Sequence, residues 1–275
     1  MKVLQNKVAL VSGSGRGIGR AIALKLAQSG ANVVVNDLDA EVAEQTAREI
    51  EALGARAVVC VGDVTAPDFG DRFVAAAVDA FGTIDIIINN AGYAWDAVVQ
   101  KTTDEQWMAM LEVHLSAPFR ILRAAQPVIA AAAKAEMADG SRAVRRTVVN
   151  ISSVAGLGGN PGQAGYAAGK MGVVGLTKTL MKEWGRYNVT VNAVAFGAIM
   201  TRMTAGEVGS ATIKVKDKEI RAGVSQEILE AMEKGIPLGR AGTPEEAAGA
   251  VYLLCLPEAD YISGQVIVAG GGWSL

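Results

Sequence analysis

The chain has 275 residues, 51% of them hydrophobic and 20% charged, with a formal net charge of −2. This composition excludes a disordered protein and is sufficient for a large buried core. The near-balanced charge offers no basic surface for nucleic acid or an anionic membrane.

Targeting and metal signals are weak. No stretch reaches the roughly 18 apolar residues that a spanning helix needs, and the apolar run after Lys7 is too short for a signal peptide. We therefore expect a cytoplasmic protein whose partners are small molecules or copies of itself. Cys60 and Cys255 lie in apolar runs and should be buried free thiols, and with one histidine in the chain no metal site is expected.

The first half of the chain alternates apolar strand-like runs with helical patterns. The runs VALVS, NVVVND, RAVVCVGD and IDIIINNAG are separated by helical patterns over residues 18–29, 40–53 and 69–81. Continuous Val/Ile runs are typical of strands buried on both faces. The sequence thus predicts an α/β fold, a single-domain Rossmann-like doubly wound parallel sheet of about seven strands flanked by helices.

The second half continues the alternation after one excursion. A capping-box pattern at Thr103 and Gln106 starts a helix, and the charged residues 134–146 should form a solvated surface segment. A strand to Ser153, a long helix from about Gln163, and the strand NVTVNAVAFG follow.

Residues 200–240 break this alternation. We expect no strand there, a short helical pattern over 226–233, and a substrate lid inserted into the single domain 1–275. Thr243-Pro244-Glu245-Glu246 begins another helix, and QVIVAG forms the last strand.

A glycine-rich turn joins the first strand to the first helix. Glycines permit a tight turn and close backbone approach, and a helix N-terminus favours phosphate oxygens. The turn therefore predicts a nucleotide site with the candidate contacts Gly13, Ser14, Arg16, Gly17, Ile18 and Gly19.

Asp37 ends the second strand, 18 residues after Gly19. Its carboxylate could accept hydrogen bonds from the adenosine ribose and would repel a 2′-phosphate, which favours NAD(H) over NADP(H). Arg16 argues the other way, since in related proteins a basic residue in such a turn can meet that phosphate. Because Leu38 and Asp39 follow Asp37 and no basic residue adjoins it, we expect NAD(H) to be preferred, with NADP(H) possible.

Tyr166 and Lys170 are four residues apart on one helix, and Ser153 lies thirteen residues before Tyr166. An ammonium beside a phenol favours the phenolate, so we expect Lys170 to lower the pKa of Tyr166. A Ser, Tyr and Lys around one oxygen suit proton transfer in carbonyl or alcohol chemistry.

Together, the Gly-x-x-x-Gly-x-Gly turn, NNAG at 89–92 and Ser153 with Tyr-x-x-x-Lys resemble the short-chain dehydrogenase/reductase family. The resemblance implies hydride exchange with a nicotinamide, with Ser153 orienting the substrate oxygen, Tyr166 moving its proton, and Lys170 contacting the ribose. His114 stands where the family carries an asparagine, and it could hold a water leading to Lys170 or be a packed structural residue. Further implied cofactor contacts are Leu38, Asp63, Val64, Asn90, Ala91, Gly92, Ile151, Tyr166, Gly197, Ile199 and Thr201.

The sequence motifs identify the substrate less specifically than they identify the cofactor. The segment from Asn150 to Lys170 is similar to 3-oxoacyl-acyl-carrier-protein reductases, whereas VVVNDL and VHL are similar to 3-hydroxyacyl-CoA dehydrogenase domains. The resemblance therefore implies a carbonyl compound or alcohol as substrate, including a thioester on acyl carrier protein or CoA. An NAD-dependent 3-hydroxyacyl-CoA or other secondary-alcohol dehydrogenase is one alternative, and a non-catalytic nucleotide-binding scaffold is another.

Specificity should reside in residues 93–98, 157–163 and 200–235, where Tyr93, Trp95, Met200 and Met203 could line an apolar pocket. The family resemblance also implies a homotetramer or homodimer.

Overall fold

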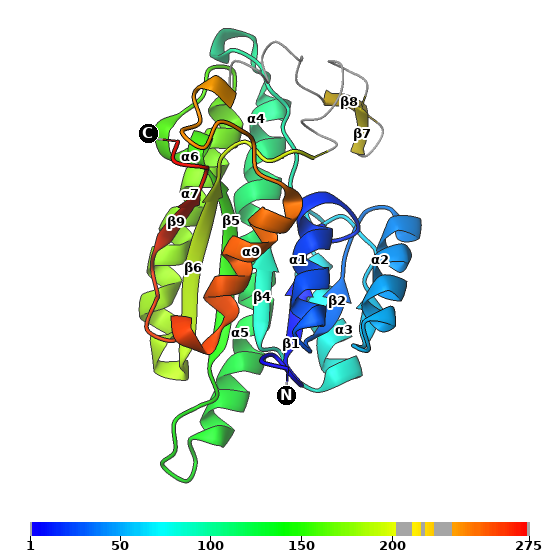
Figure 1. Cartoon of the computed structure of the whole chain (residues 1–275), viewed down its shortest axis with the longest axis vertical. Helices are drawn as coiled ribbons and strands as arrows, with labels where there is room; N and C mark the ends of the chain where they lie inside the picture. Colours follow the sequence, from blue (N-terminus) through cyan, green and yellow to red (C-terminus); the bar gives the residue numbers. More distant parts are fainter. Residues whose placement is uncertain (1, 202–210, 216–217, 223–232, 274–275) are drawn as a thin grey trace.

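A parallel sheet forms the centre of the computed structural model, which describes residues 2–201, 211–215, 218–222 and 233–273 (Figure 1). Its strand order is β3-β2-β1-β4-β5-β6-β9, and every neighbouring pair is parallel. The strands are β1 (Val8–Val11), β2 (Asn32–Val35), β3 (Ala57–Val59), β4 (Ile86–Asn89), β5 (Arg146–Ser153), β6 (Val189–Phe196) and β9 (Val266–Ala269). This confirms the predicted doubly wound sheet. The order reverses between β1 and β4, and open α/β sheets bind ligands at such a point, beyond the carboxyl ends of the strands.

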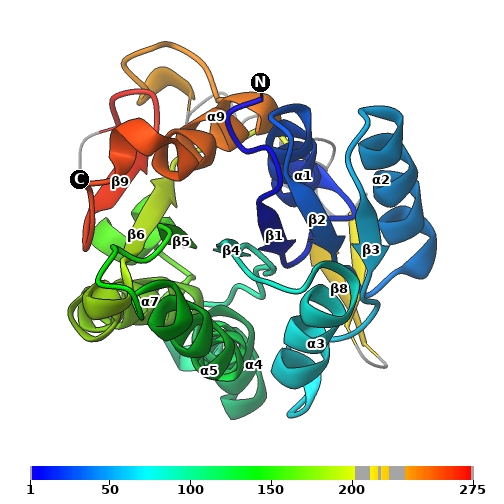
Figure 2. The same ribbon diagram turned by 90° about the horizontal axis from the view of Figure 1, so that it is seen from below.

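Helices cover both faces of the sheet, as can be seen in Figure 2, which looks along the strands. One face carries α1 (Gly17–Gln28), α2 (Ala40–Ala52) and α9 (Pro244–Cys255). The other carries α3 (Phe69–Phe81), α4 (Asp104–Leu111), α5 (Ala117–Glu136) and α7 (Ala164–Trp184).

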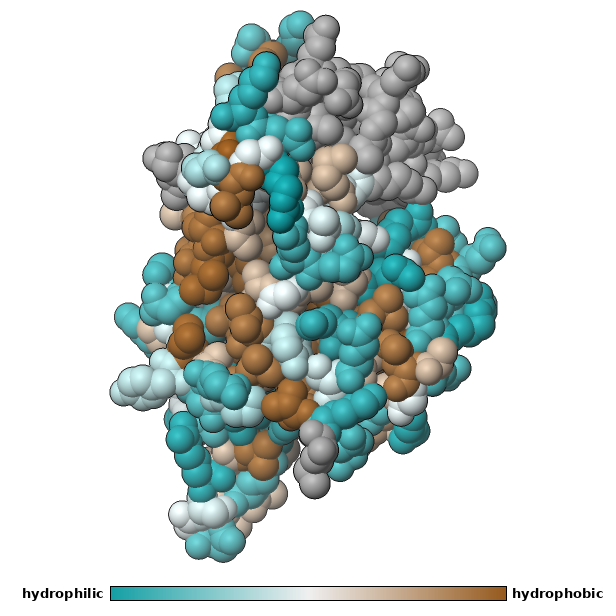
Figure 3. Space-filling view, in the orientation of Figure 1, coloured by the Kyte–Doolittle hydropathy of each residue, from teal (hydrophilic) through white to brown (hydrophobic). Residues whose placement is uncertain are grey.

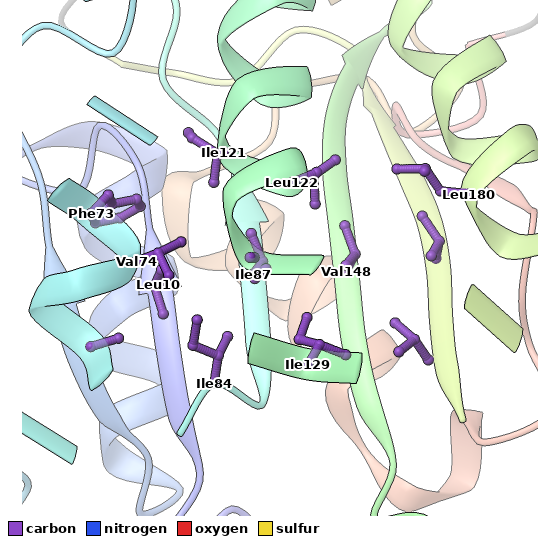
Figure 4. Packing of buried hydrophobic residues seen from close by; sticks show 14 of the residues in the cluster. Leu10, Phe73, Val74, Ile84, Ile87, Ile121, Leu122, Ile129, Val148 and Leu180 are labelled. Atoms are coloured by element: carbon purple, nitrogen blue, oxygen red, sulfur yellow. The ribbon is translucent and has the colours of Figure 1, made fainter. Parts of the chain in front are cut away.

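Alternate residues along the strands point into two separate hydrophobic cores, one on each face of the sheet. Leu10, Ile87 and Val148 point to the α3 and α5 side, where Phe73 and Ile121 pack against them (Figure 4). Their strand neighbours, such as Ala9, Ile88 and Val149, join the other cluster. Each large side chain so buried contributes about 1.5–3 kcal/mol. This double burial explains why the strands have no polar alternation.

The predicted helix starts are confirmed. Thr103 and Gln106 form a complete capping box at α4, and Thr243 and Glu246 form another at α9. A π-helical segment, η2 (Glu112–Ser116), joins α4 to α5. The shorter elements are η1 (Val99–Lys101), α6 (Val154–Gly158), η3 (Gly185–Tyr187) and η4 (Pro257–Ala259).

Cys60 and Cys255 are both free and buried, as expected. Among the helices that the structure describes, none combines the length and apolar character needed to cross a membrane.

The prediction that the basic residues of the 134–146 segment are solvated is wrong at its end. Arg146 is only 3% exposed and bonds Glu136 through both NH groups, at 3.0 and 2.7 Å. The Arg145 side chain is also only 13% exposed to solvent, and it donates to the carbonyls of Leu254 and Leu256 at the end of α9. Arg146 also donates to the Ile84 carbonyl at 3.2 Å, so both guanidinium groups attach this segment to the body of the fold, where a buried charge needs such partners.

The prediction of no strand within 200–240 is also wrong. Strands β7 (Ala211–Val215) and β8 (Lys218–Ala222) pair antiparallel as a separate two-stranded sheet. The helical pattern expected over 226–233 lies almost entirely outside the described residues, as does Met203.

Candidate active site

The glycine turn lies between β1 and α1. Gly13 and Gly17 have φ of 60° and 56°, in the left-handed region that favours glycine. A Cβ on Gly19 would lie 2.0 Å from the Gly13 carbonyl oxygen, so no other residue fits there without movement. Arg16, the N-cap of α1, makes no side-chain cap, and the first turn holds no acidic residue. The helix N-terminus therefore presents uncapped N–H groups suited to phosphate oxygens.

Two polar residues that the sequence analysis missed hold this turn in place. Asn36 accepts a hydrogen bond from the Gly13 N–H at 3.0 Å and donates to the Cys60 and Gly62 carbonyls. The Ser12 hydroxyl accepts from the backbone N–H groups of Asn90 and Ala91. A polar residue at the end of an apolar strand was the available signal for Asn36.

Asn90 links the NNAG segment to the same turn. Its side-chain amide donates to the carbonyls of Ser12 and Gly13, at 3.0 Å each. A Cβ on Gly13 would lie 2.8 Å from Ala91 Cα, so the two segments touch along their backbones. The predicted contacts Asn90, Ala91 and Gly92 therefore adjoin the glycine motif.

Asp37 lies against the turn, because a Cβ on Gly15 would meet its Oδ2 at 2.7 Å. The Arg16 guanidinium is 2.8 Å from Asp39 and 4.0 Å from Asp37. An acidic side chain at the end of β2 beside a glycine turn and a free helix N-terminus fits a dinucleotide. These residues could hold its ribose and phosphates.

The other predicted nucleotide contacts lie at the same edge but differ in exposure. Asp63 accepts from the Thr65 N–H and hydroxyl at 2.8 and 2.7 Å, so part of its carboxylate is engaged. The Val64 and Ile151 side chains are buried, and Ile18 packs against the α1 core. Only the backbones of Val64 and Ile151 remain for a ligand. Leu38 is 52% exposed.

Ser153, Tyr166, Lys170 and His114 meet beyond the end of β5. The Ser153 side chain hydrogen bonds to Tyr166 and also accepts from the Ala155 N–H at 3.2 Å. Ser152, its neighbour, points elsewhere and donates to the Lys170 carbonyl at 2.8 Å. Strand alternation thus separates the two hydroxyls, and Ser153 is the one beside the phenol.

Lys170 does not lower the pKa of Tyr166 as expected. Burial raises the pKa of Tyr166, and the hydrogen bond from Ser153 opposes that rise. The Lys170 Nζ lies 5.6 Å from the phenol centroid and donates to the Ile151 carbonyl at 2.8 Å. Burial also lowers the pKa of Lys170 to about 7, so its charge is itself disfavoured. Desolvation therefore shifts both groups in the direction opposite to that needed for a phenolate beside an ammonium.

His114 lies in the π-helical segment η2 and is 3% exposed. Its Nε2 is 2.7 Å from the Tyr93 carbonyl oxygen, so Nε2 carries the proton. Burial, with Lys170 nearby, holds the pKa of His114 well below its usual value. The buried Nδ1 has no hydrogen-bond partner among the described residues. The side chain is therefore a neutral imidazole with a bare acceptor.

Two glycines make room for His114. A Cβ on Gly92 would lie 2.4 Å from the imidazole Cε1, and one on Gly169 would lie 2.9 Å from the His114 Cβ. Gly92 belongs to the NNAG segment and Gly169 to α7. The histidine therefore occupies a space formed by the cofactor-side loop and the helix of Tyr166.

The segment after β6 is held by backbone contacts. Gly197 donates to the Ala269 carbonyl at 3.1 Å, and a Cβ there would lie 2.7 Å from Gly270 Cα. Ile199 bridges to Gly242 and is 7% exposed. Thr201 is the last described residue before the gap at 202–210. These contacts place Gly197 and Ile199, two of the predicted cofactor contacts, at the carboxyl end of β6.

Two of the expected substrate segments, residues 93–98 and 157–163, contact each other. Ala97 donates to the Gly162 carbonyl at 2.9 Å, and Gln163 donates to Asp96 at 2.7 Å. Tyr93 and Trp95, in the first of these segments, are partly buried against the core. Burial raises the pKa of Asp96.

Comparison with known proteins agrees with this geometry. A family model described as enoyl-(acyl carrier protein) reductase matches residues 13–274. The 3-oxoacyl-(acyl-carrier-protein) reductase FabG of Thermotoga maritima is 37% identical over 98% of both chains. The corresponding reductase of Synechocystis is 37% identical over 99% of this chain and 98% of its own.

Solved structures agree as well. The crystal structure of a dehydrogenase/reductase from Sinorhizobium meliloti superposes with a TM-score of 0.83 and 30% identity, covering 99% of this chain and 96% of that one. A second structure from the same organism has a TM-score of 0.84 and 31% identity. The sequence resemblance is confirmed: the chain belongs to the short-chain dehydrogenase/reductase family of NAD(P)-dependent oxidoreductases.

Proposed function

We propose that the protein interconverts a 3-oxoacyl thioester and the 3-hydroxyacyl thioester, with acyl carrier protein as the carrier and the reductive direction favoured. The convergence of Ser153, Tyr166 and Lys170 beside the glycine turn carries this proposal. The acyl-carrier-protein carrier is supported by curated relatives with that name along the whole chain.

The side chains divide the work at the reacting oxygen. When bound, the nicotinamide supplies or accepts the hydride at C4. Ser153 donates a hydrogen bond to the substrate carbonyl oxygen and aligns it with Tyr166. Tyr166 transfers its proton to that oxygen during reduction and takes it back during oxidation. Lys170 would hold the ribose of a bound nucleotide and, when protonated, would stabilise the phenolate.

His114 has a supporting role in this proposal. Its neutral ring cannot supply a proton at Nδ1, because the proton is on Nε2. The bare Nδ1 can accept one hydrogen bond, from a water leading towards Lys170 or from a ligand hydroxyl.

We further propose that NAD(H) is preferred over NADP(H). Asp37 and Asp39 place two carboxylates beside the expected adenosine ribose. A 2′-phosphate there would meet like charge, whereas a free 2′-hydroxyl could donate to Asp37. This feature also favours the second candidate, an NAD-dependent 3-hydroxyacyl-CoA dehydrogenase, because NAD(H) suits oxidation.

The protein is proposed to be cytoplasmic and to form a single domain of residues 1–275, in which residues 200–240 serve as a substrate lid.

We also propose that the protein forms a homotetramer or homodimer. Strand β9 supports this, since it ends the sheet and two of its four apolar residues are exposed, Ile267 at 39% and Val268 at 42%. Apolar surface gathers over this region in Figure 3. Paired edges would cover both the apolar side chains and the unpaired strand backbone.

A steady-state assay decides among these functions. Acetoacetyl thioesters of acyl carrier protein and of CoA are offered with NADH or NADPH, and the reverse reaction uses 3-hydroxybutyryl-CoA with NAD. We expect turnover of the acyl-carrier-protein thioester with NADH to have the highest kcat/KM. A higher kcat/KM for oxidation of 3-hydroxybutyryl-CoA would favour the dehydrogenase. Nucleotide binding without any turnover would favour the non-catalytic binding scaffold.

A further inference from the structure

We propose that Asp39 is a specificity-determining residue that engages Arg16 and thereby suppresses binding of nucleotides with a 2′-phosphate. This inference rests on the proposed nucleotide site. Arg16 is the one basic residue of the glycine turn, and arginine suits phosphate through its paired N–H donors. Its availability therefore decides whether the turn can accept NADP(H).

The Arg16 guanidinium is already engaged by carboxylates. One NH group lies 2.8 Å from Asp39 Oδ2, and its Nε lies 4.0 Å from Asp37 Oδ2. Arg16 carries one positive charge and the two aspartates carry two negative charges, so the net charge of the three side chains is −1. An incoming 2′-phosphate must displace Asp39 from Arg16 and remain near both carboxylates.

Asp39 is anchored more firmly than an ordinary surface carboxylate. Its Oδ1 accepts from the Glu41 N–H at 3.1 Å as the N-cap of α2, which leaves Oδ2 for Arg16. Its backbone N–H donates to Asp37 Oδ1 at 3.2 Å. Exposed ion pairs are weak when both side chains must be ordered for the pair alone. Here the helix cap already orders Asp39.

The test replaces Asp39 while keeping the cap. Asparagine caps a helix as well as aspartate does, so Asp39→Asn removes the charge and preserves the start of α2. Dissociation constants of adenosine 2′,5′-bisphosphate and of 5′-AMP are measured by calorimetry, together with those of NADP and NAD. These are binding measurements and need no turnover.

We expect the affinity for the bisphosphate relative to 5′-AMP to rise about tenfold in Asp39→Asn, the size of one charge-assisted hydrogen bond. Arg16→Ala in the same background should abolish the gain, because it removes the released guanidinium. Asp39→Ser, which also caps a helix, should reproduce the gain if asparagine itself perturbs the fold.

The neighbouring pair of Arg20 and Glu49 provides a matched control. It also joins an α1 arginine to an α2-side carboxylate, so Glu49→Gln makes the same change in net charge. The binding ratio should stay at its wild-type value in this variant.

Two results would overturn the Asp39 assignment: an unchanged ratio in both Asp39 variants, or a gain that persists without Arg16. Failure of the wild-type protein to bind both 5′-AMP and NAD would instead overturn the nucleotide site itself. The two failures are therefore distinguishable.

Discussion

The imidazole of His114 packs edge-on against the phenol of Tyr166, with ring centroids 4.8 Å apart and an interplanar angle of 80°. Aromatic pairs favour this geometry. The same imidazole bonds the Tyr93 carbonyl, so one side chain links the loop after β4 to the proposed proton donor. His114 is thus placed to position Tyr166 as well as to hold a water.

His114→Asn should lower kcat several-fold without changing the shape of the pH–rate profile. Asparagine can still donate to the Tyr93 carbonyl, but it lacks the ring that supports Tyr166. Burial keeps the pKa of His114 far below the working pH, so no ionisation of His114 should be visible in the wild-type profile. The profile of kcat/KM between about pH 5 and 9 checks this. A limb that disappears in His114→Asn would show that a titrating histidine takes part.

Tyr166→Phe should reduce kcat by about 10²–10⁴-fold, the range for loss of a general acid. Nucleotide affinity should change little, because the hydroxyl is proposed to act on substrate oxygen. Tyr252→Phe is the matched control, since it removes a hydroxyl bonded to Ser29 on the α1 and α9 side of the sheet. Wild-type turnover by Tyr166→Phe would refute the assigned role.

The sequence predicted the fold because the information is local. Apolar runs such as the three isoleucines that begin β4 mark strands covered on both faces, and Thr103 with Gln106 marks a helix start within four residues. The spacing of Tyr166 and Lys170 likewise places both on one helix. Each signal needs only neighbouring residues.

The features that the sequence did not predict depend on contacts with other elements of the fold. Nothing beside Arg146 in the sequence indicates that Glu136 lies across from it, or that the sheet covers its side chain. The pKa of Tyr166 depends on burial by several elements, which a helix spacing does not measure. For Asn36 the sequence shows only a polar residue at a strand end, and its role depends on tertiary contacts with the glycine turn.

The free energy of unfolding should rise with pH above about 7 in the ligand-free protein because of Lys170. Its pKa falls from 10.5 to about 7 on burial, so the unfolded chain binds more protons between these values. The resulting slope is at most about 1.4 kcal/mol per pH unit. Urea denaturation at several pH values checks this. Lys170→Met should flatten the dependence, and Lys178→Met at an exposed site of the same helix should not. Identical slopes in all three proteins would contradict the assignment.

Glu136→Ala should destabilise the protein by about 3 kcal/mol, because it leaves the buried Arg146 guanidinium without its carboxylate. Glu44→Ala is the control, since its pair with Arg48 is about 60% exposed on both sides and should contribute little. The hydrogen bonds from Arg146 lower the pKa of Glu136, so its contribution is present above the unfolded pKa and is lost as pH falls through the folded one. The two variants should therefore converge in stability in acid. Equal stabilities at pH 7 would show that the Arg146 pair is as weak as the exposed one.

Val268→Lys should lower the oligomeric mass if β9 is the contact between copies. A lysine in an edge strand opposes pairing with another edge, because its charge would have to be buried in the contact. Val268 is 42% exposed, and Val144 in the segment before β5 is 45% exposed, so Val144→Lys makes the same change away from β9. Light scattering after size exclusion should give a smaller species for Val268→Lys alone. An unchanged multimeric mass would exclude the β9 edge, and a monomeric wild-type protein would exclude the oligomer.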